Sequence, residues 1–479
     1  MHRLEYADLV IVGGGPAGMS AAIEARAAGV RSVVLLDEGP SLGGQIFRRY
    51  GEGFRVTDAR AAGHEYSDGE ALIEKALASG ADIRSSTIVW GIWNKQIAYV
   101  SGGTEAGTLV ARTILLATGA RDRAVAFPGW TLPGVMTAGA AKIMVAIQRV
   151  LPGKRILMAG SGPLALAFSA QLRNYGANVV EVTEAAPGPG PAALLRLATT
   201  GEPATLMDAA RYRTRLMRDG VPFSYSTIIL RAEGDGKVER AVVAKVDRDW
   251  RVVPGSERTI EVDSVLSGYG LESSTELSRL IGCRHSFDRD RGGWLPDKDE
   301  MMRTTLPGVY AAGDGSGVGG APHAMAEGRI AGIMLARELG TISDAEAAAA
   351  AAPSRARLAR LKRFVRTLNA AYRIGPGLFE LATPETLVCR CEERTAGDLD
   401  NVLADGVADP NIVRALSRIG MGRCQGRNCA SHVTATIARR SNIPADRIPW
   451  LSSRPPVRPV SVAALAEERV QHESAVEIR

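Results

Sequence analysis

The stretch LVIVGGGPAGMSAAIEARAA at residues 9–28 combines a hydrophobic strand, a glycine loop and a helical run. The loop, Gly13 to Gly18, has the pattern G-x-G-x-x-G. The first glycine of this pattern permits a tight turn, the second lets backbone amides approach a pyrophosphate, and the third lets the helix pack close to the strand. The helix N-terminus also favours the phosphate charge. A strand before this loop and a helix after it predict a nucleotide-binding fold.

A second strand at 32–36 ends at Asp37, where a carboxylate would hold the ribose hydroxyls of a bound dinucleotide. Glu38 is the alternative, and the spacing favours Asp37. The residues expected at this first site are Gly13, Gly15, Pro16, Ala17, Gly18, Asp37 and Glu38.

Three further segments indicate that the first ligand is FAD. Gly43-Gly44-Gln45 follows the acid, where many two-domain flavoproteins bring backbone to the flavin. Residues 113–120 (TILLATGA) look like the strand and turn that return the chain to the FAD domain. Residues 306–314 (LPGVYAAGD) resemble a late flavoprotein motif whose aspartate accepts a hydrogen bond from the ribityl chain. These segments add Gly44, Gln45, Thr118, Gly119, Gly313 and Asp314 to the expected site.

A second loop repeats the arrangement. A strand at 155–159 precedes GSGPLA at 160–165, and a strand at 178–183 leads to Glu184. The interval from Gly160 to Glu184 equals that from Gly13 to Asp37, so we expect an inserted second nucleotide domain. Because Glu184 would repel a 2′-phosphate, NADH is preferred to NADPH if a nicotinamide binds; ATP and an empty site remain alternatives. The expected residues are Gly160, Gly162, Pro163, Leu164 and Glu184.

Five cysteines are present, and none precedes Cys283. Dithiol chemistry at the flavin, which needs a cysteine pair there, is therefore excluded. Cys283 is expected to be a small buried hydrophobe. No catalytic side chain stands out.

The other four cysteines, Cys389, Cys391, Cys424 and Cys429, form a C-x-C and a C-x₄-C pair separated by 32 residues. Two thiolate pairs suit a [2Fe–2S] cluster. Structural zinc, the alternative, more often uses pairs spaced by two to four residues.

Composition is that of an ordinary globular protein, with 46% hydrophobic and 23% charged residues. The net charge of +6 is spread along the chain and does not argue for nucleic acid. No leader and no window of ~18–20 apolar residues is evident, so a cytoplasmic protein without a transmembrane segment is expected.

The predicted fold is α/β, with two Rossmann-like domains and a small helical C-terminal [2Fe–2S] domain. The FAD-binding domain (1–125 and 281–343) is split by the second nucleotide domain (126–280). A helical connector (344–384), the cysteine domain (385–450) and a C-terminal tail (451–479) as a partner contact complete the chain.

The whole chain resembles the alpha subunits of bacterial opine oxidases, those for octopine and nopaline, and related subunits of hydrogen cyanide synthase and of proline or hydroxyproline dehydrogenases. The motifs at 13–18, 43–46, 117–120, 160–164 and 313–314 carry this resemblance, together with the four cysteines. The cysteine half is similar to the bacterioferritin-associated ferredoxin type of [2Fe–2S] domain, most specifically in the segment GMGRCQGR at 420–427.

The resemblance implies an electron-transfer role in a complex. A separate beta flavoprotein similar to D-amino acid oxidases would oxidise the C–N bond, and this chain would take up the electrons. An FMN at the partner interface and a small ferredoxin-like third chain are also implied. The alternatives are a stand-alone NADH:acceptor oxidoreductase and a non-catalytic scaffold.

Overall fold

The computed structural model describes residues 4–51, 53–54, 64–200 and 202–466. The chain folds as two compact units. Unit 1 comprises 1–120, 273–362 and 452–479, and unit 2 comprises 121–272 and 363–451.

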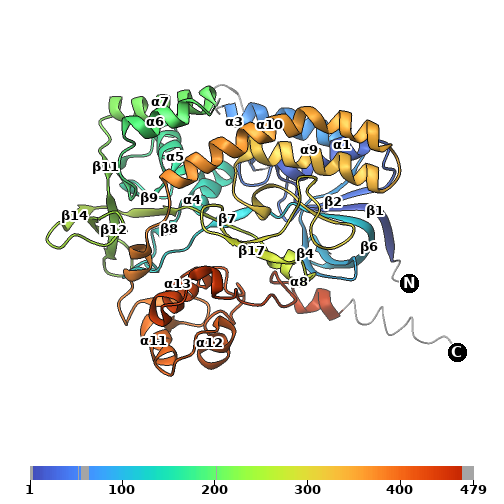
Figure 1. Ribbon diagram of the computed structural model, residues 1–479. Coiled ribbons are helices and arrows are strands. Elements are labelled where there is room, and N and C mark those ends of the chain that lie inside the picture. Colours follow the sequence, from blue (N-terminus) through green and yellow to red (C-terminus); the bar gives the residue numbers. More distant parts are fainter. Residues whose placement is uncertain (1–3, 52, 55–63, 201, 467–479) are drawn as a thin grey trace. The chain divides into compact units, whose positions relative to one another are not determined.

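Unit 1 is built on a seven-stranded sheet of order β3-β2-β1-β6-β5-β4, with β19 paired to β6 (Figure 1). The strands β3, β2, β1, β6 and β19 are mutually parallel, whereas β4 and β5 complete an antiparallel meander with β6. The strand bounds are β1 Glu5–Val12, β2 Val33–Leu36, β3 Asp82–Arg84, β4 Thr87–Trp93, β5 Gln96–Ser101, β6 Glu105–Leu116 and β19 Val309–Ala311. A two-stranded ribbon, β17 His285–Asp288 and β18 Gly293–Pro296, precedes β19.

The central strand β1 is buried on both faces, which explains its uninterrupted hydrophobic run. Leu9 and Ile11 join the core beneath the helices, and Val10 and Val12 join a second core with β4 and β5. Helices of this unit in the described residues include α1 Pro16–Ala27, α3 His64–Ala78, α8 Glu276–Leu280 and α9 Ala321–Glu338. Helices α1 and α9 lie side by side, and a β-carbon at Gly328 would come within 2.1 Å of the carbonyl oxygen of Ala17 (Figure 1).

Helix α10 (Asp344–Ala371) lies in the predicted helical connector and is continuous through Pro353. Its residues Ala347, Ala351, Leu358 and Leu361 are buried in the first core. That packing, with the high helix propensity of the alanine run, offsets the roughly 3 kcal/mol that an interior proline costs.

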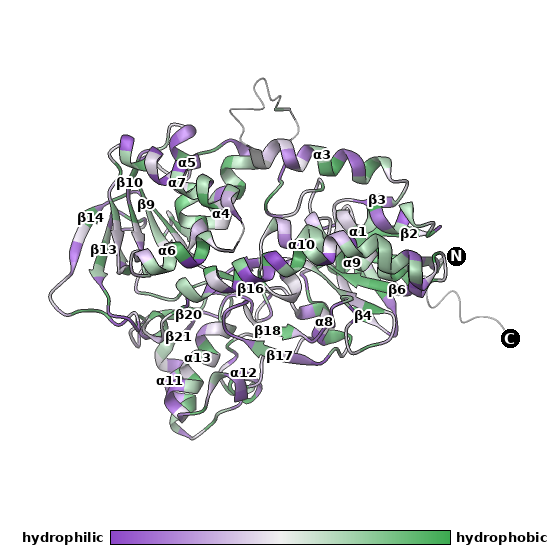
Figure 2. Ribbon diagram, turned by 45° about the horizontal axis from the view of Figure 1, so that its top comes forward, coloured by the Kyte–Doolittle hydropathy of each residue, from purple (hydrophilic) through white to green (hydrophobic). Residues whose placement is uncertain are grey.

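Unit 2 contains an all-parallel five-stranded sheet of order β11-β10-β9-β15-β8 and an antiparallel sheet of order β12-β13-β14. Figure 2 shows β13 as strongly hydrophobic, consistent with its four buried central residues. The strand bounds are β8 Val135–Thr137, β9 Ile156–Ser161, β10 Val179–Glu184, β11 Phe223–Tyr225, β12 Thr227–Glu233, β13 Arg240–Lys245, β14 Arg258–Glu261 and β15 Ser264–Tyr269. Its first helices are α4 Ala138–Ile143, continued by a π-helical turn at Met144–Gln148, α5 Pro163–Asn174, α6 Pro191–Ala198 and α7 Pro203–Arg218.

Strands β7 (Ala120–Asp122) and β16 (Leu271–Ser273) pair where the chain passes from one unit to the other. The two Rossmann-like parallel sheets confirm the α/β class predicted from the glycine loops.

The cysteine region consists of short helices and strands. They are β20 Leu387–Cys389, β21 Arg394–Thr395, α11 Ala396–Ala404, α12 Pro410–Ser417 and α13 Ala430–Ser441, with 3-10 turns at Pro376–Glu380 and Ala445–Arg447. Buried side chains of this region, among them Val388, Leu399 and Val433, share a single core with Leu157 and Tyr269 of the second sheet. The cysteine region therefore packs as part of unit 2.

The described part of the C-terminal tail packs on its own chain in unit 1. Val457 is buried in the core below β4, and its amide donates to the carbonyl of Trp90 at 2.8 Å. Residues 467–479 lie outside the described residues.

Candidate functional site

The first glycine loop joins β1 to α1 at the carboxyl end of the parallel sheet. A β-carbon at Gly18 would lie 1.9 Å from the carbonyl oxygen of Gly13, and one at Gly13 would lie 2.2 Å from that of Ala117. A β-carbon at Gly15 would meet only Gly44, at 3.7 Å. Gly13 and Gly18 are therefore required by packing, whereas the space above Gly15 is open to a ligand.

The N-terminus of α1 is available to that ligand. Pro16 occupies its first turn, and among the described residues no side chain caps it at Gly15. The first-turn amides and the helix dipole suit a pyrophosphate.

Asp37 is tied to the loop by its carboxylate. Its Oδ2 accepts the amide of Gly14, and its Oδ1 accepts that of Gly39 at 2.8 Å. Burial raises the pKa of Asp37, although both amides act in the opposite direction. Each carboxylate oxygen can accept more than one hydrogen bond, so Asp37 can also accept hydrogen bonds from ribose hydroxyls. Glu38 points elsewhere, to Arg458.

The three flavin motifs converge on the same loop. The amide of Gly43 donates to Gly14 at 3.0 Å, and a β-carbon at Gly44 would lie 2.8 Å from Cα of Gly15. A β-carbon at Gly315 would meet the Thr118 hydroxyl oxygen at 2.6 Å. The fold thus gathers residues that are far apart in the sequence.

Three of the predicted residues in these motifs are held by hydrogen bonds to other residues of the chain. The Gln45 amide oxygen accepts from Arg48 at 2.7 Å, and the Thr118 hydroxyl donates to the carbonyl of Ser274 at 2.6 Å. Asp314 accepts the amide of Gly319 at 2.9 Å. The turn residue Gly119 has a φ of +68°.

A buried charged cluster beneath Gly313 was missed from the sequence. Nζ of Lys298 lies 2.6 Å from Oε2 of Glu327, and the same oxygen accepts the amide of Gly313 at 2.8 Å. Although burial disfavours its charge, Lys298 and the adjacent groups hold the pKa of Glu327 below its ordinary value. In the sequence, this cluster is indicated by a glutamate, Glu327, in the middle of the alanine- and glycine-rich helix α9.

His323 lies beside this cluster. Its Nδ1 is 3.8 Å from Oε1 of Glu327, and burial lowers its pKa to about 4. Among the described residues Nδ1 has no hydrogen-bond partner.

The second loop has the same construction. Oε2 of Glu184 accepts the amide of Gly162 at 2.9 Å, and Oε1 accepts that of Ala186 at 2.8 Å. A β-carbon at Gly160 would lie 2.4 Å from the carbonyl oxygen of Gly268. Pro163 starts α5 and Leu164 packs on the core below it.

An aromatic side chain lies beside this second loop, whereas only backbone lies beside Gly15. The nearest atom to a β-carbon at Gly162 would be Cγ of Tyr372, at 3.9 Å. Burial, with the nearby Glu184, raises the pKa of Tyr372 to about 12. A tyrosine ring therefore borders the path that a pyrophosphate would take.

The four cysteines are free thiols that lie near one another, since Cys429 interacts with the other three. Cys389 on β20 pairs with Cys429 at the start of α13, and Cys391 pairs with Cys424. The hydrogen bond with Cys429, with three backbone amides, lowers the pKa of Cys389 to about 6. The bond with Cys389, followed by burial, raises the pKa of Cys429 well above its ordinary value.

Tight packing fixes the loop that carries the second pair. A β-carbon at Gly422 would lie 2.3 Å from Cβ of Cys391, so only glycine fits there. Trp130 supports the first pair, because its Nε1 donates to the carbonyl of Leu387 at 2.6 Å. The guanidinium of Arg390 lies over the Trp130 ring, 5.3 Å from its centroid. Cys283 is buried in unit 1, as expected.

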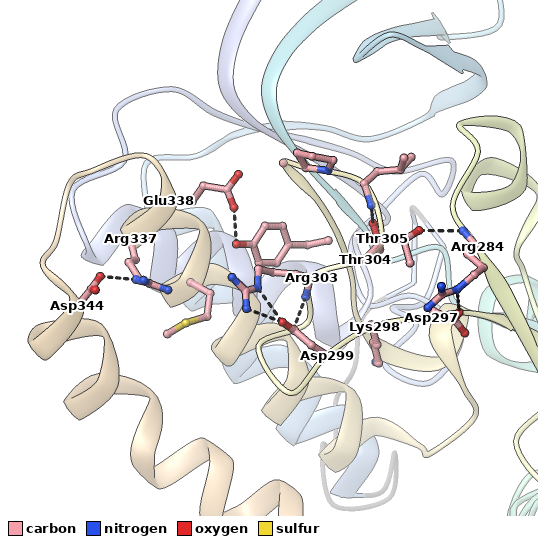
Figure 3. A pocket seen from close by; sticks show the side chains of 15 residues that line it. Arg284, Asp297, Lys298, Asp299, Arg303, Thr304, Thr305, Arg337, Glu338 and Asp344 are labelled. Atoms are coloured by element: carbon pink, nitrogen blue, oxygen red, sulfur yellow. Dashed lines mark hydrogen bonds and ion pairs between the residues drawn. The ribbon is translucent and has the colours of Figure 1, made fainter.

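A charged pocket of about 820 Å³ lies at the other end of β19, lined by the loop 297–308 and the end of α9 (Figure 3). Its cations are matched by acids. Arg284 pairs with Asp297, Arg303 with Asp299, and Arg337 with Asp344. Because the arginines and aspartates of this pocket are paired with one another, the pocket gives no indication of a charged ligand.

The two loops, each with its acid, and the flavin motifs define an FAD-dependent oxidoreductase. Residues 7–328 match the pyridine nucleotide-disulphide oxidoreductase family, and residues 383–469 match the sarcosine oxidase A3 domain. Within that class, the chain belongs to the family that comprises the A subunits of opine oxidases and the HcnB subunits of hydrogen cyanide synthases.

The relatives are similar over nearly their whole length. The A subunit of the Agrobacterium tumefaciens opine oxidase is 34% identical, over 96% of this chain and 92% of that protein. The HcnB subunit of Pseudomonas aeruginosa hydrogen cyanide synthase is 33% identical, over 95% and 97%. The crystal structure of L-proline dehydrogenase from P. horikoshii shares the fold, with a TM-score of 0.68 at 21% identity, over 97% of this chain and 81% of that one. In the described part of the chain, no helix is long and apolar enough to cross a membrane.

Proposed function

We propose that this chain is the electron-transferring alpha subunit of a heteromeric flavin-dependent dehydrogenase that acts on an amine, opine or imino acid. FAD occupies the first loop, and a [2Fe–2S] cluster is held by Cys389, Cys391, Cys424 and Cys429. When bound, the flavin takes up two electrons and the cluster passes one at a time.

The observation that carries this proposal is that four thiols from two distant segments lie near one another, since Cys429 interacts with the other three. A [2Fe–2S] cluster takes two ligands on each iron. A zinc ion needs three or four ligands around one point. The single residue between Cys389 and Cys391 favours the cluster, because the cysteine pairs of structural zinc sites are more often spaced by two to four residues.

This chain's residues bind and orient these groups. Gly15 and the first turn of α1 receive the pyrophosphate, Asp37 the ribose hydroxyls, and Asp314 the ribityl chain. Three backbone amides, those of Cys391, Glu392 and Gly420, hydrogen-bond the sulfur of Cys389. Such amides stabilise negative charge on a cluster and tune its potential. No side chain of this site is assigned to the oxidation of a C–N bond.

The substrate site is therefore assigned to a partner. The relatives are named as subunits of opine oxidase and of hydrogen cyanide synthase, which supports a heteromeric complex. A beta flavoprotein similar to D-amino acid oxidases is the expected partner, and a small ferredoxin-like third chain is a further one.

A second candidate function is that of a stand-alone NADH:acceptor oxidoreductase. The anchored carboxylate of Glu184 at the second loop favours it. The ring of Tyr372 beside Gly162 counts against it.

Purification of the tagged chain from its own host tests the proposal. We expect a D-amino-acid-oxidase-like flavoprotein to co-purify, and we expect NADH not to bleach the flavin of the isolated chain. If the chain emerges alone and NADH reduces it, the relay function fails and the stand-alone function replaces it.

Iron and acid-labile sulfide analysis tests the cluster. We expect two irons and two sulfides per chain, and their loss in Cys391→Ser with the complex still assembled. Cys283→Ser is the matched control, because this buried thiol lies outside the four-cysteine site. Unchanged turnover in the assembled Cys391→Ser complex would favour a scaffold.

A further inference from the structure

The C-terminal tail reaches the first nucleotide site of its own unit. Val457 is 2% exposed and belongs to the same hydrophobic core as Val34 and Leu36 of β2. Its amide donates to Trp90 on β4, and farther along the hydroxyl of Ser461 donates to Gly103 at 3.3 Å. Two separate contacts therefore hold this segment in place.

Arg458 follows this anchored valine and binds Glu38. Its Nε lies 2.9 Å from Oε2 of Glu38, and its Nη2 donates to Oε1 at 3.3 Å. Both carboxylate oxygens are engaged, which is the bidentate geometry that fixes orientation as well as charge. Arg458 is 27% exposed and Glu38 is 54% exposed.

Glu38 is a neighbour of the acid that faces the ribose. Asp37 is tied to the glycine loop, and the charge of Glu38 acts unfavourably on the ionised form of Asp37. A dinucleotide adds two phosphate charges in front of the same loop. Repulsion between such groups acts over roughly 8–10 Å at ordinary ionic strength. The site needs cations. Arg458 pairs with Glu38, and Arg48 interacts with both Asp37 and Glu38.

We propose that Arg458 is a positioning residue of the first nucleotide site, which neutralises Glu38 and fixes the turn from Asp37 to Gly39 around the adenosine ribose. This inference rests on the proposed function, in which FAD occupies the first loop. The recognised chemistry is the adenosine diphosphate moiety, which FAD and free ADP share. The tail thereby becomes part of the cofactor site.

The test is the affinity of the apoprotein for FAD and for ADP. Replacement of Arg458 by alanine removes an exposed ion pair, and we expect the dissociation constant for each ligand to rise roughly fivefold. Arg458→Glu should weaken both on the order of tenfold, because it adds repulsion to the lost attraction. Arg458→Lys should restore most of the affinity. The losses should shrink above ~0.5 M salt, where charges are screened.

The control is Arg454→Ala, because Arg454 is an exposed arginine of the same tail. In a Glu38→Ala background, loss of Arg458 should have no further effect, since the two residues act as a pair. A merely structural role would lower the melting temperature of the apoprotein equally in both backgrounds.

The two possible failures can be told apart. If the wild-type protein does not bind FAD, the proposed function fails. The ADP affinities of the wild type and the Arg458 variants then still test the role of Arg458. If wild type, Arg458→Ala and Arg458→Glu bind ADP and FAD equally well, the inference about Arg458 is overturned.

Discussion

Replacing Lys298 with methionine removes the cation that faces Glu327 in the interior of unit 1. The side chain of Glu327 is fully buried, and that of Lys298 is 10% exposed. After the substitution the carboxylate of Glu327 still accepts the amide of Gly313. Among the described residues, Lys298 is the one positively charged group within 4 Å of it, and His323, which also lies within 4 Å, is neutral.

The cost follows from the desolvation of an unpaired buried charge. Breaking such a pair by removing one partner costs about 3–5 kcal/mol. For a unit of this size each kcal/mol corresponds to roughly 2–4 °C, so unit 1 should melt roughly 6–20 °C lower. FAD should be released at the same temperature, because Glu327 holds the amide of Gly313 in the flavin motif.

The assay is thermal unfolding followed by FAD fluorescence between pH 4 and pH 8. In the wild type, the folded-state pKa of Glu327 lies below its unfolded value, so its contribution is present above ~pH 4.5 and is lost as the pH falls through the folded-state pKa. In Lys298→Met the burial of Glu327 is uncompensated and its pKa rises. The difference between variant and wild type should therefore be largest near neutral pH and shrink toward pH 4.

Lys75→Met is the matched control, since Lys75 is exposed on α3, and it should change the melting temperature by less than roughly 2 °C. The double variant Lys298→Met with Glu327→Met should regain much of the loss, because it leaves no buried charge. A single variant as stable as the control, or a double variant worse than either single, refutes the reasoning.

Three other predictions concern the two loops and the thiols. Gly15→Ala should fold normally and lose FAD, because its β-carbon fills the pyrophosphate space; Gly13→Ala should fail to fold, because its β-carbon would lie 2.2 Å from a carbonyl oxygen. Solubility and bound FAD separate these outcomes. Cys391→Ser should lose its iron but keep its FAD, as measured by metal analysis and absorbance, whereas retained iron would contradict the assignment. Tyr372→Ala should increase ADP binding to the FAD-loaded protein, and an unchanged isotherm would show that this ring does not restrict the second loop.

The glycine loops were predictable because their requirements are local. A strand, three spaced glycines, a helix and an acid leave few alternative folds, and Asp37 and Glu184 lie where the spacing predicts. The start of α1 was predicted three residues late, since Pro16 begins the helix. Proline is favoured in a first turn because it has no amide to leave unsatisfied.

Long-range charge pairs were not predictable. The bond between Lys298 and Glu327 joins a loop to a helix, and that between Arg458 and Glu38 joins residues 420 positions apart. Neither pair leaves a spacing pattern, because any lysine or arginine could satisfy either acid.

The sequence by itself determined the two Rossmann-type folds, the lack of any cysteine before Cys283 and the set of four cysteines near the C-terminus, because each depends on residue type and spacing. Only the tertiary structure decided how the cysteines pair, which side chain borders the second loop, and that the tail returns to the first site. These are contacts between distant segments, and their partners are selected by the packing of β-sheets and helices around shared cores rather than by neighbouring residues.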